Sequence, residues 1–374
     1  MNLSLIKSTE FWESDSCEIA AKSGERHPAL HGLKSCVLFR TSGTTGGGSW
    51  VVLSKSALQI SANAVNQWLD VDGESRWGLS LPMNHVGGFG VVARAHAAQC
   101  GLSVFNGKWN PQEFRKWLAD EAVTHVSVVP TQLHDLMAAG LSSPSSLRAI
   151  VVGGGRLDAV LGQTARNRGW PVLASFGMTE TCSQVGTQEI ASLRESFVQS
   201  PIRILPIWET RLSDSGRLMI RGNALLEGSF EQENNEWLYR PRLGDWWQTS
   251  DRAELSGDVI IPKGRVDSIV KILGELVDLE AVEQKFISLA GEDLGENQFA
   301  VVAIPDPRRE HALVAVFQGK KVVFQKLYDR WQIEAAGIER FSELVFVEEL
   351  PTTELGKLKR GALQEKVIAM RTGN

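Results

Sequence analysis

A run of glycine and hydroxyl residues follows the first strongly apolar segment of the sequence. The run is Thr41-Ser-Gly-Thr-Thr-Gly-Gly-Gly-Ser49, and the apolar segment before it is Cys36-Val-Leu-Phe39. Glycines allow several backbone N–H groups to converge on one anion, and Ser and Thr hydroxyls add further donors. The pattern therefore predicts a loop that binds polyphosphate. A flexible Gly/Ser linker has the same composition and is the alternative interpretation.

Two better-known phosphate motifs do not fit. In the P-loop a lysine and a hydroxyl residue follow the last glycine, but Ser49 and Trp50 stand at those positions. A second glycine cluster begins at Gly153 after an apolar run, but the dinucleotide-binding pattern would there end on Asp158 instead of a glycine. A plain strand-to-helix turn explains that cluster equally well.

The elements that must position these residues alternate between strands and helices. β-branched runs cover 36–39, 126–129, 149–152, 299–304 and 313–317. This alternation is typical of an α/β protein. The best-marked helix follows Asn110, which caps it, with Pro111 in its first turn, Glu113 completing a capping-box pattern and an apolar face that begins at Phe114.

The texture of the sequence changes after residue 200. Segment 200–258 is rich in Trp and punctuated by glycines, which predicts a small β subdomain with hairpins. Beyond it a helix presents Leu279, Val282, Phe286 and Leu289 on one face, and two strands follow. Residues 267–374 are therefore expected to form a separate domain.

Composition bounds the class of protein. The chain has 374 residues, of which 43% are apolar and 22% charged, as in ordinary globular proteins of two or three domains. Its 39 basic and 44 acidic residues give no general electrostatic reason to bind nucleic acid or an anionic membrane. We find neither a signal-like pattern in residues 1–15 nor an apolar run of the roughly 18 residues that span a bilayer, so we expect a cytoplasmic protein.

The cysteines bear on redox chemistry and metal binding. Four cysteines lie far apart in the sequence, at Cys17, Cys36, Cys100 and Cys182. This spacing offers neither a disulfide framework nor a Cys-x-x-Cys metal pair. We expect reduced thiols.

Five segments, in the expected order, resemble motifs of the adenylate-forming acyl-CoA synthetase superfamily. They are the loop from Thr41, Ser175-Phe-Gly-Met-Thr-Glu-Thr181, Thr249-Ser-Asp251, Gly264-Arg-Val-Asp267 and Pro351-Thr-Thr-Glu-Leu-Gly-Lys357. Three further segments, Pro82-Met-Asn-His-Val-Gly-Gly88, Val126-Ser-Val-Val-Pro-Thr-Gln-Leu133 and Met178-Thr-Glu-Thr-Cys-Ser-Gln184, resemble the o-succinylbenzoate–CoA ligases of menaquinone and phylloquinone biosynthesis. The resemblance implies a large α/β adenylate-forming domain, residues 1–266, and a small mobile α+β cap domain, residues 267–374.

The activity that the resemblance implies has two half-reactions. A carboxylate of 2-succinylbenzoate attacks the α-phosphorus of ATP, with Mg²⁺ present, to give an acyl adenylate and diphosphate, and the thiol of CoA then displaces AMP. Joining two anions at phosphorus requires positive charge and oriented donors. The alternatives are another aryl- or acyl-CoA ligase or adenylating enzyme, and a non-catalytic nucleotide-binding relative.

The same resemblance assigns the nucleotide site. Six loop residues are expected to hold the β and γ phosphates: Thr41, Ser42, Gly43, Thr44, Thr45 and Gly46. Three glycines are expected to lie beside adenine: Gly153, Gly154 and Gly155. Asp251 and Arg265 are expected at the ribose, Thr179 at the α-phosphate, and Glu180 on Mg²⁺, which prefers carboxylate oxygen. Read without the other motifs, Thr179-Glu180 is an ordinary helix start.

Lys357 is the residue expected to catalyse adenylation, because a lysine there offsets charge in the transition state. His85 borders the acyl pocket, where a gating or carboxylate-binding role and a purely structural role are equally open. For a second carboxylate the candidates are Arg94 and Arg156. Other expected lining residues of the acyl pocket are Gly87, Gly88, Thr181, Ser183 and Gln184. Asp267 is expected to be the hinge that removes Lys357 and brings Gly274 to the CoA channel.

Three departures from the family pattern stand out. Gly48-Ser49 replaces the usual Pro-Lys of the loop, which removes a charge for the γ-phosphate, and the candidates to compensate are Mg²⁺, Arg40 and Lys55. Ser250 replaces the usual glycine before Asp251. The stretch before the loop is shorter than in relatives, so we expect part of one wall of the large domain to be missing or rebuilt. A second subunit, in a homodimer, could then cover the exposed edge.

Overall fold

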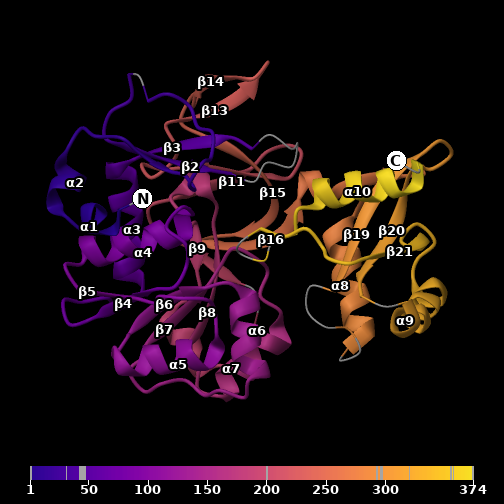
Figure 1. Ribbon diagram of the computed structural model, residues 1–374, viewed down its shortest axis with the longest axis horizontal. Helices are drawn as coiled ribbons and strands as arrows, with labels where there is room; N and C mark the ends of the chain where they lie inside the picture. The colour runs from indigo at the N-terminus through magenta and orange to yellow at the C-terminus, as the bar shows by residue number, and fades with distance from the viewer. Residues whose placement is uncertain are drawn as a thin grey trace. The chain divides into compact units, whose positions relative to one another are not determined.

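The computed structural model describes residues 2–30, 32–41, 48–198, 201–291, 294, 298–319, 321–353, 356 and 358–372. Backbone contacts divide the chain into two compact units. The larger contains the described residues up to Thr249 together with Ala253–Pro262, and the smaller contains Ser250–Arg252 and the described residues from Lys263 onward. Figure 1 labels most of the elements of both.

The larger unit is built on an eleven-stranded sheet of described residues. In spatial order its strands are β11 (Glu209–Leu212), β12 (Arg217–Arg221), β15 (Trp247–Ser256), β16 (Val259–Arg265), β10 (Ile202–Ile204), β9 (Gly186–Thr187), β8 (Val172–Phe176), β7 (Ala149–Val152), β6 (His125–Val128), β4 (Arg76–Leu79) and β5 (Gly101–Val104). The five strands from β8 to β5 run parallel, and the pairs β8–β9, β9–β10, β10–β16 and β11–β12 are antiparallel. Parallel neighbours need crossover connections, which helices supply.

Five helices cover the two faces of the parallel strands (Figure 1). They are α3 (Lys55–Trp68), α4 (Val86–Ala97), α5 (Pro111–Asp120), α6 (Pro130–Ala138) and α7 (Ala159–Asn167). Strand β7 shows the division, because Ala149 and Val151 pack in the core cluster of α3 and α4 while Ile150 and Val152 pack in that of α5 to α7. A strand buried on both faces is apolar throughout, which is why this run stood out in the sequence.

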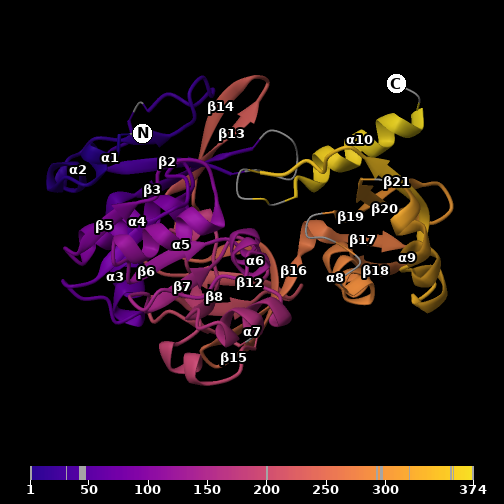
Figure 2. The same ribbon diagram turned by 60° about the horizontal axis from the view of Figure 1, so that its bottom comes forward.

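A second sheet carries the glycine-rich loop. Its order is β1 (Glu18–Ala20), β2 (Cys36–Arg40), β3 (Trp50–Ser54), β13 (Gly228–Glu233) and β14 (Glu236–Pro241). The hairpin of β13 and β14 projects from this sheet in both ribbon views, Figures 1 and 2. The short helices α1 (Leu3–Ile6) and α2 (Thr9–Glu13) precede β1 and bury Ile6, Phe11 and Trp12 in the core cluster that contains Phe89 of α4.

The hairpins expected in segment 200–258 are present as β11–β12 and β13–β14. They belong to two different sheets, because β11 and β12 extend the eleven-stranded sheet whereas β13 pairs with β3. Short 3-10 helices also occur in the chain: η1 (Thr179–Thr181), η2 (Ile190–Arg194) and η3 (Val266–Ser268).

The smaller unit has a three-stranded sheet covered on both faces. Its elements are the hairpin β17 (Ile269–Ile272) and β18 (Glu275–Asp278), the strands β19 (Phe299–Asp306), β20 (Glu310–Gln318) and β21 (Phe341–Val347), and the helices α8 (Leu279–Ala290), α9 (Lys321–Glu334) and α10 (Arg360–Thr372). Val301 and Ala315 pack in the cluster of α8 and α9, whereas Val302 and Val316 pack in that of α10.

The two helices marked in the sequence form as expected. Asn110 Oδ1 accepts a hydrogen bond from Glu113 N (3.0 Å) at the start of α5, whose Phe114 and Leu118 are buried. Helix α8 buries three residues of its predicted apolar face, Leu279, Val282 and Phe286.

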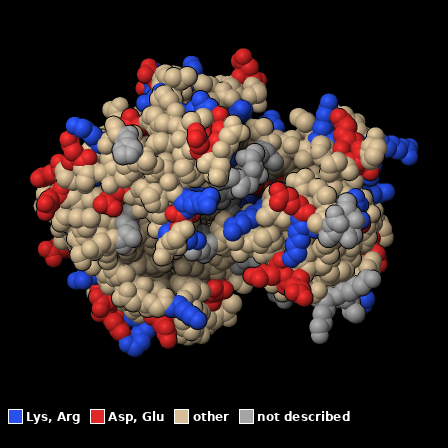
Figure 3. Space-filling view, turned by 45° about the horizontal axis from the view of Figure 1, so that its top comes forward, with Lys and Arg blue, Asp and Glu red and all other residues tan. Residues whose placement is uncertain are grey.

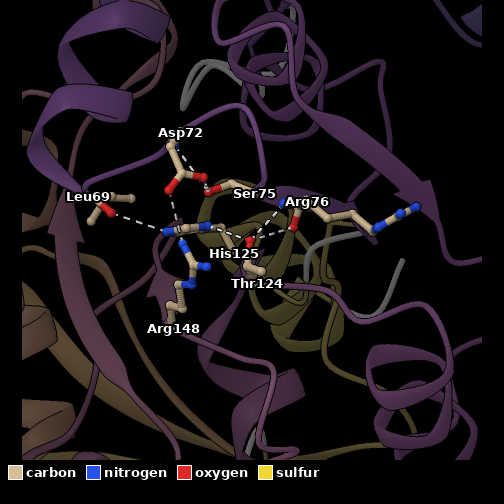
Figure 4. A network of polar contacts seen from close by, with 7 residues as sticks. All are labelled: Leu69, Asp72, Ser75, Arg76, Thr124, His125 and Arg148. Carbon is tan, nitrogen blue, oxygen red and sulfur yellow. Dashed lines mark hydrogen bonds and ion pairs between the residues drawn. The ribbon is translucent and has the colours of Figure 1, made fainter.

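A buried polar network joins the N-terminal ends of β4 and β6 (Figure 4). Thr124 Oγ1 accepts from Arg76 N (2.8 Å) and lies 2.8 Å from His125 Nδ1, while His125 Nε2 lies 3.2 Å from Leu69 O. A carbonyl can only accept, so Nε2 carries a proton. Burial lowers the pKa of His125 to about 4, so the ring is neutral at pH 7 and serves as a structural tie.

The surface carries both signs of charge. Figure 3 shows acidic and basic side chains interspersed on the face in view. No helix in the described part of the chain is both long and apolar enough to cross a membrane.

Candidate functional site

The C-terminal ends of the parallel strands gather several of the predicted residues. His85 follows β4 and is the N-cap residue of α4, the glycines from Gly153 follow β7, and Thr179 and Glu180 follow β8 in η1. Ligands of parallel α/β sheets bind outside this edge. The topology therefore places the residues expected at the acyl group, the adenine and the α-phosphate at the C-terminal ends of strands in one sheet.

The glycine turn after β7 requires its glycines. A Cβ on Gly153 would lie 2.9 Å from Ser175 Oγ, and Gly154 has φ +76°, a left-handed conformation that favours glycine. Gly153 N donates to Val128 O (3.1 Å), and Ser175 Oγ donates to Val152 O (3.0 Å). These bonds tie β6, β7 and β8 together at the turn and leave a backbone surface without side chains, as a flat ring needs for close approach.

The loop after β8 is tightly folded. A Cβ on Gly177 would lie only 1.6 Å from Ser183 O, so no other residue fits there. Cys182 and Ser183 both have positive φ, 52° and 99°, which is uncommon for residues with side chains. Such strain collects at functional sites, where the surroundings hold it in place. This loop therefore fixes the backbone of Thr179 and Glu180, and Leu226 N donates to Glu180 O (2.9 Å).

Arg94 is the most unusual charged residue of the larger unit. Its side chain lies on α4 and is 2% exposed, with Nη1 3.2 Å from Ser127 Oγ, Nη2 3.5 Å from Ser183 Oγ and the guanidinium 5.2 Å from the centre of the Trp77 ring. Burial lowers the pKa of Arg94 to about 10. None of the described Asp or Glu side chains forms an ion pair with it.

A buried guanidinium without a carboxylate is expensive, because its desolvation is not compensated by an opposite charge. Gly90, one helical turn earlier, leaves room for it, since a Cβ there would lie 3.4 Å from Arg94 Nη2. Arg156, the other arginine considered from the sequence, is exposed. The sequence signal for Arg94 was a single charge within an otherwise apolar helix.

The other expected lining residues divide into three groups. Ser183 points its hydroxyl to Arg94, as described. Thr181 and Gln184 are buried and bonded within the framework, Thr181 Oγ1 to Met178 O (3.1 Å) and Gln184 Oε1 to Thr187 Oγ1 (2.8 Å). Gly87 and Gly88 lie in the first turn of α4, and a Cβ on Gly88 would lie 2.3 Å from Pro82 O.

The glycine-rich loop is described only at its ends. Ser42, Gly43, Thr44, Thr45 and Gly46 lie outside the described residues.

At the base of the loop, Thr41 N donates to Ser49 O (2.8 Å), and the two hydroxyls are 2.8 Å apart. Gly48 has φ +59°, which proline cannot adopt. A proline at position 48, as in the family pattern, would therefore not fit this backbone conformation.

The two cations considered as substitutes for the missing lysine have other partners. Arg40 Nη1 pairs with Glu25 Oε1 (2.7 Å). Lys55 is buried, and its Nζ donates to Phe11 O (2.5 Å) and Ser14 O (3.0 Å). In the described part of the chain, Lys55 therefore supports the N-terminal helices.

In the smaller unit the structure brings Asp251 and Arg265 together. Arg265 Nη1 lies 3.9 Å from Asp251 Oδ2, and both side chains are at least partly buried. Gly274 has φ +86° and its N–H donates to Glu310 Oε2 (2.9 Å).

Lys357 lies outside the described residues, as does the side chain of Asp267. Near Lys357 in sequence, Arg360 forms a two-pronged pair with Glu283, at 2.6 and 2.9 Å, which anchors the start of α10 to α8.

Metal binding was expected at Glu180. No group of three or more His, Cys, Asp or Glu side chains that could hold a metal occurs among the described residues. Mg²⁺ does not need such a cage when a nucleotide is present, because it is bound by one or two carboxylates together with phosphates and water. A single Glu180 carboxylate is thus chemically suited to a Mg²⁺ that arrives with a polyphosphate.

Comparisons with known proteins identify the family of this chain. The profile of a family described as AMP-binding enzyme matches residues 4–228. A 2-succinylbenzoate–CoA ligase of Staphylococcus aureus is 32% identical over 241 residues, which is 62% of this chain and 47% of that protein. The chain thus spans about half the length of the curated relatives it matches.

Solved structures match over most of the chain. A single-substitution variant of E. coli MenE with bound OSB-AMS matches with a TM-score of 0.70 and 26% identity, over 88% of this chain and 68% of that chain. The o-succinylbenzoate CoA synthetase of Bacillus subtilis, in complex with the acyl-adenylate intermediate OSB-AMP, matches with a TM-score of 0.76 and 23% identity over the same shares. These likenesses confirm the predicted α/β fold class with its small C-terminal domain.

Proposed function

Because this chain belongs to the AMP-binding enzyme family, we propose that it activates 2-succinylbenzoate with ATP and transfers the acyl group to CoA. The first half-reaction forms the acyl adenylate and releases diphosphate, and the second releases AMP. This is a step of menaquinone biosynthesis. The names of the relatives support the choice of acid, and one feature of this chain supports it independently.

That feature is the buried, uncompensated charge of Arg94. The acid has two carboxylates, of which one must attack ATP while the other has to be desolvated in the pocket. An arginine fork binds a carboxylate through two parallel charge-assisted hydrogen bonds. Arg94, with Ser127 and Ser183 within 3.5 Å of its nitrogens, supplies the charge and adjacent hydroxyl donors. An acid with a single carboxylate would leave this arginine unpaired.

The aromatic ring of the acid also has a suitable environment. Arg94 extends over Trp77, and Gly90, which has no side chain, leaves space on the helix surface beside the guanidinium. We place the ring of the substrate near the C-terminal ends of β6 and β8, between Arg94 and the loop of Thr179. His85, at the start of α4, lies on the same edge and is proposed to border the acyl chain.

The nucleotide roles of the larger unit follow from the same edge. We propose that Gly153, Gly154 and Gly155 lie beside adenine, that Thr179 contacts the α-phosphate, and that Glu180 ligates Mg²⁺. The ion would neutralise phosphate charge. The strained loop supports this assignment, because it holds both side chains on a fixed backbone.

Roles in the smaller unit complete the proposal. The Asp251 carboxylate and the Arg265 guanidinium are proposed to bind the ribose hydroxyls, a carboxylate being a good acceptor for two of them. Lys357 is proposed to stabilise the adenylation transition state, and the loop from Thr41 to hold the β and γ phosphates. CoA is the co-substrate of the second half-reaction.

An acid panel tests the proposed function. Diphosphate release with ATP and Mg²⁺ is measured for 2-succinylbenzoate, benzoate, anthranilate and a fatty acid, each with and without CoA. We expect 2-succinylbenzoate alone to give rapid release, and CoA to yield the thioester and AMP. Release with a monocarboxylate at the same rate would refute the proposed substrate, and binding of ATP without release for any acid would indicate a non-catalytic relative.

A further inference from the structure

Two cysteines that the proposed reaction does not use lie in contact. Cys36 Sγ donates a hydrogen bond to Cys17 Sγ at 2.9 Å. Cys36 is 2% exposed, whereas Cys17 is partly exposed. A solvent reagent can therefore reach Cys17, and Cys36 is the only partner thiol in contact with it among the described residues.

Strand pairing independently places the two backbones side by side. Strands β1 and β2 are parallel with Glu18 opposite Val37, so the same register, continued by one residue toward the N-terminus, brings Cys17 opposite Cys36. Neighbouring strands are about 4.8 Å apart, and disulfides join Cα atoms about 4.4 to 6.8 Å apart. A bond between the two sulphurs therefore needs no movement of the strands.

The surroundings connect this pair to the N-terminal segment, defined here as residues 2–17. Besides Phe11 O and Ser14 O, Lys55 Nζ donates to Ser14 Oγ and Ser16 Oγ, both at 3.1 Å. Burial raises the pKa of the Cys36 thiol, as does its hydrogen bond to Cys17, while the Lys55 ammonium acts in the opposite direction. The net direction is upward, so Cys36 is held as a thiol, and the partly exposed Cys17 is the sulphur that a solvent reagent meets first.

The segment itself packs on the helix that carries Arg94. Trp12 stacks on His96 of α4 with ring centres 5.2 Å apart, and lies 5.8 Å from Phe89. Phe11 lies 6.4 Å from the same Phe89. The segment leads into β1, which pairs with β2, and beyond β1 the described residues 21–30 and 32–35 form no helix or strand, so the covalent path from the segment to Cys36 is a long irregular connection.

We propose that Cys17 and Cys36 form a redox modification site, at which a small-molecule disulfide links the N-terminal segment covalently to β2. This inference does not depend on the proposed ligase activity. The disulfide holds residues 2–17 against α4 even when the backbone between Cys17 and Cys36 is cleaved.

The exchange is balanced in two steps. The Cys17 thiolate attacks one sulphur of a small disulfide such as glutathione disulfide, which forms a mixed disulfide and releases one glutathione thiolate. The Cys36 thiolate then attacks Cys17 Sγ and displaces the second glutathione thiolate. In sum the two cysteine thiols lose two protons and two electrons, and the small disulfide becomes two thiols.

Peptide mapping tests the proposal on the full chain. The protein is equilibrated with glutathione disulfide and glutathione at rising ratios, quenched in acid, alkylated and digested with trypsin without reduction. The peptides that carry the two cysteines are residues 8–22 and 35–40. We expect them to be recovered as one cross-linked species that dithiothreitol separates, while Cys100 and Cys182 stay alkylated.

Variants sharpen the outcome. In Cys36→Ser, Cys17 should accumulate as a stable glutathione adduct, and in the matched control Cys100→Ser the cross-link should form as in the wild type. On oxidation the midpoint of thermal unfolding should rise in the wild type and in Cys100→Ser only, because the link restricts the unfolded chain. A wild-type protein that stops at the Cys17 adduct, or whose Cys17 and Cys36 both stay free under oxidising ratios, overturns the proposal.

Discussion

Replacing Arg94 by methionine would separate a binding role from a structural one. Methionine keeps much of the volume and removes the charge and the fork. If Arg94 serves the substrate, the variant loses activity while the folded protein keeps or gains stability. If Arg94 serves the fold, both properties fall together.

The stability change can be estimated from the burial of the guanidinium. Its pKa is lowered from 12.5 to about 10, and at 1.36 kcal/mol per unit the charged form is held at a cost of about 3 kcal/mol. Against this gain, the variant loses the hydrogen bonds to Ser127 and Ser183, which stabilise the wild type by about 1 kcal/mol each. We therefore expect Arg94→Met to raise the free energy of unfolding by about 1 kcal/mol, measured by urea denaturation without substrate at pH 7.

The effect on catalysis has the opposite sign. Removing one partner of a buried charge pair costs about 2 to 5 kcal/mol, which at about 1.4 kcal/mol per tenfold corresponds to a loss of about 30-fold to 4,000-fold in kcat/KM for 2-succinylbenzoate. The KM for ATP should change little, because Arg94 lies on α4 and the proposed nucleotide residues lie after β7 and β8.

A thermodynamic cycle of two enzymes and two kinds of acid isolates the interaction between Arg94 and the second carboxylate. Wild type and Arg94→Met are assayed by diphosphate release with 2-succinylbenzoate and with its two analogues that each lack one carboxylate. The wild type should prefer the dicarboxylate strongly over the analogue that cannot pair with Arg94, and the variant should lose this preference. The matched control is Arg156→Met, which removes an exposed arginine near the same edge and should alter neither preference nor stability.

Two results would refute the reasoning. Equal losses for the dicarboxylate and for both analogues would show that Arg94 acts through the fold of the pocket. A loss of preference in Arg156→Met with Arg94→Met unchanged would move the second carboxylate to the other arginine.

Three further predictions address the loop, the C-terminal motif and the opposite edge of the sheet. Ser49→Lys should lower the KM for ATP in diphosphate release by restoring a cation near the γ-phosphate, with Ser49→Ala as control; an unchanged KM would show that the charge is supplied elsewhere. Lys357→Ala should abolish diphosphate release yet largely spare thioester formation from supplied acyl adenylate, and undiminished release would sink that role. The pKa of His125 is about 4 in the folded protein and 6.5 in the unfolded chain, so acid favours unfolding. Between pH 7.5 and pH 5 the free energy of unfolding of the wild type should therefore fall by about 2 kcal/mol more than that of His125→Asn. Parallel pH curves for the two proteins would contradict this.

The local elements were well predicted because local physics decides them. The cap at Asn110 and the apolar period of α8 act within one or two turns, so the sequence alone identifies both helices. Strands such as β7 are buried on both faces and are therefore uniformly apolar. The hairpins of segment 200–258 were visible for the same reason, but their distribution between two sheets was not, since pairing of β13 with β3 joins residues far apart in sequence.

The candidate site was only partly predictable. Motif spacing pointed to Thr179, Glu180 and the glycines after β7, which the strand order then brings to one edge. It could not choose between Arg94 and Arg156, because that choice depends on which one is buried, a property of the packing of α4 against the sheet. The sequence also suggested Lys55 as a cation near the phosphates, whereas the structure buries its ammonium group against carbonyl groups of the N-terminal helices.

The N-terminal and C-terminal ends of the parallel strands differ in how well their polar groups are matched by hydrogen-bond or charge partners. At the N-terminal edge His125 is neutral and both its ring nitrogens have partners. At the C-terminal edge Arg94 keeps a charge that no described carboxylate balances, and Ser183 holds a strained backbone with φ 99°. A fold selected only for stability would remove both features, since each raises the free energy of the native state. Their occurrence together, 3.5 Å apart, is accounted for if an anionic ligand completes the edge.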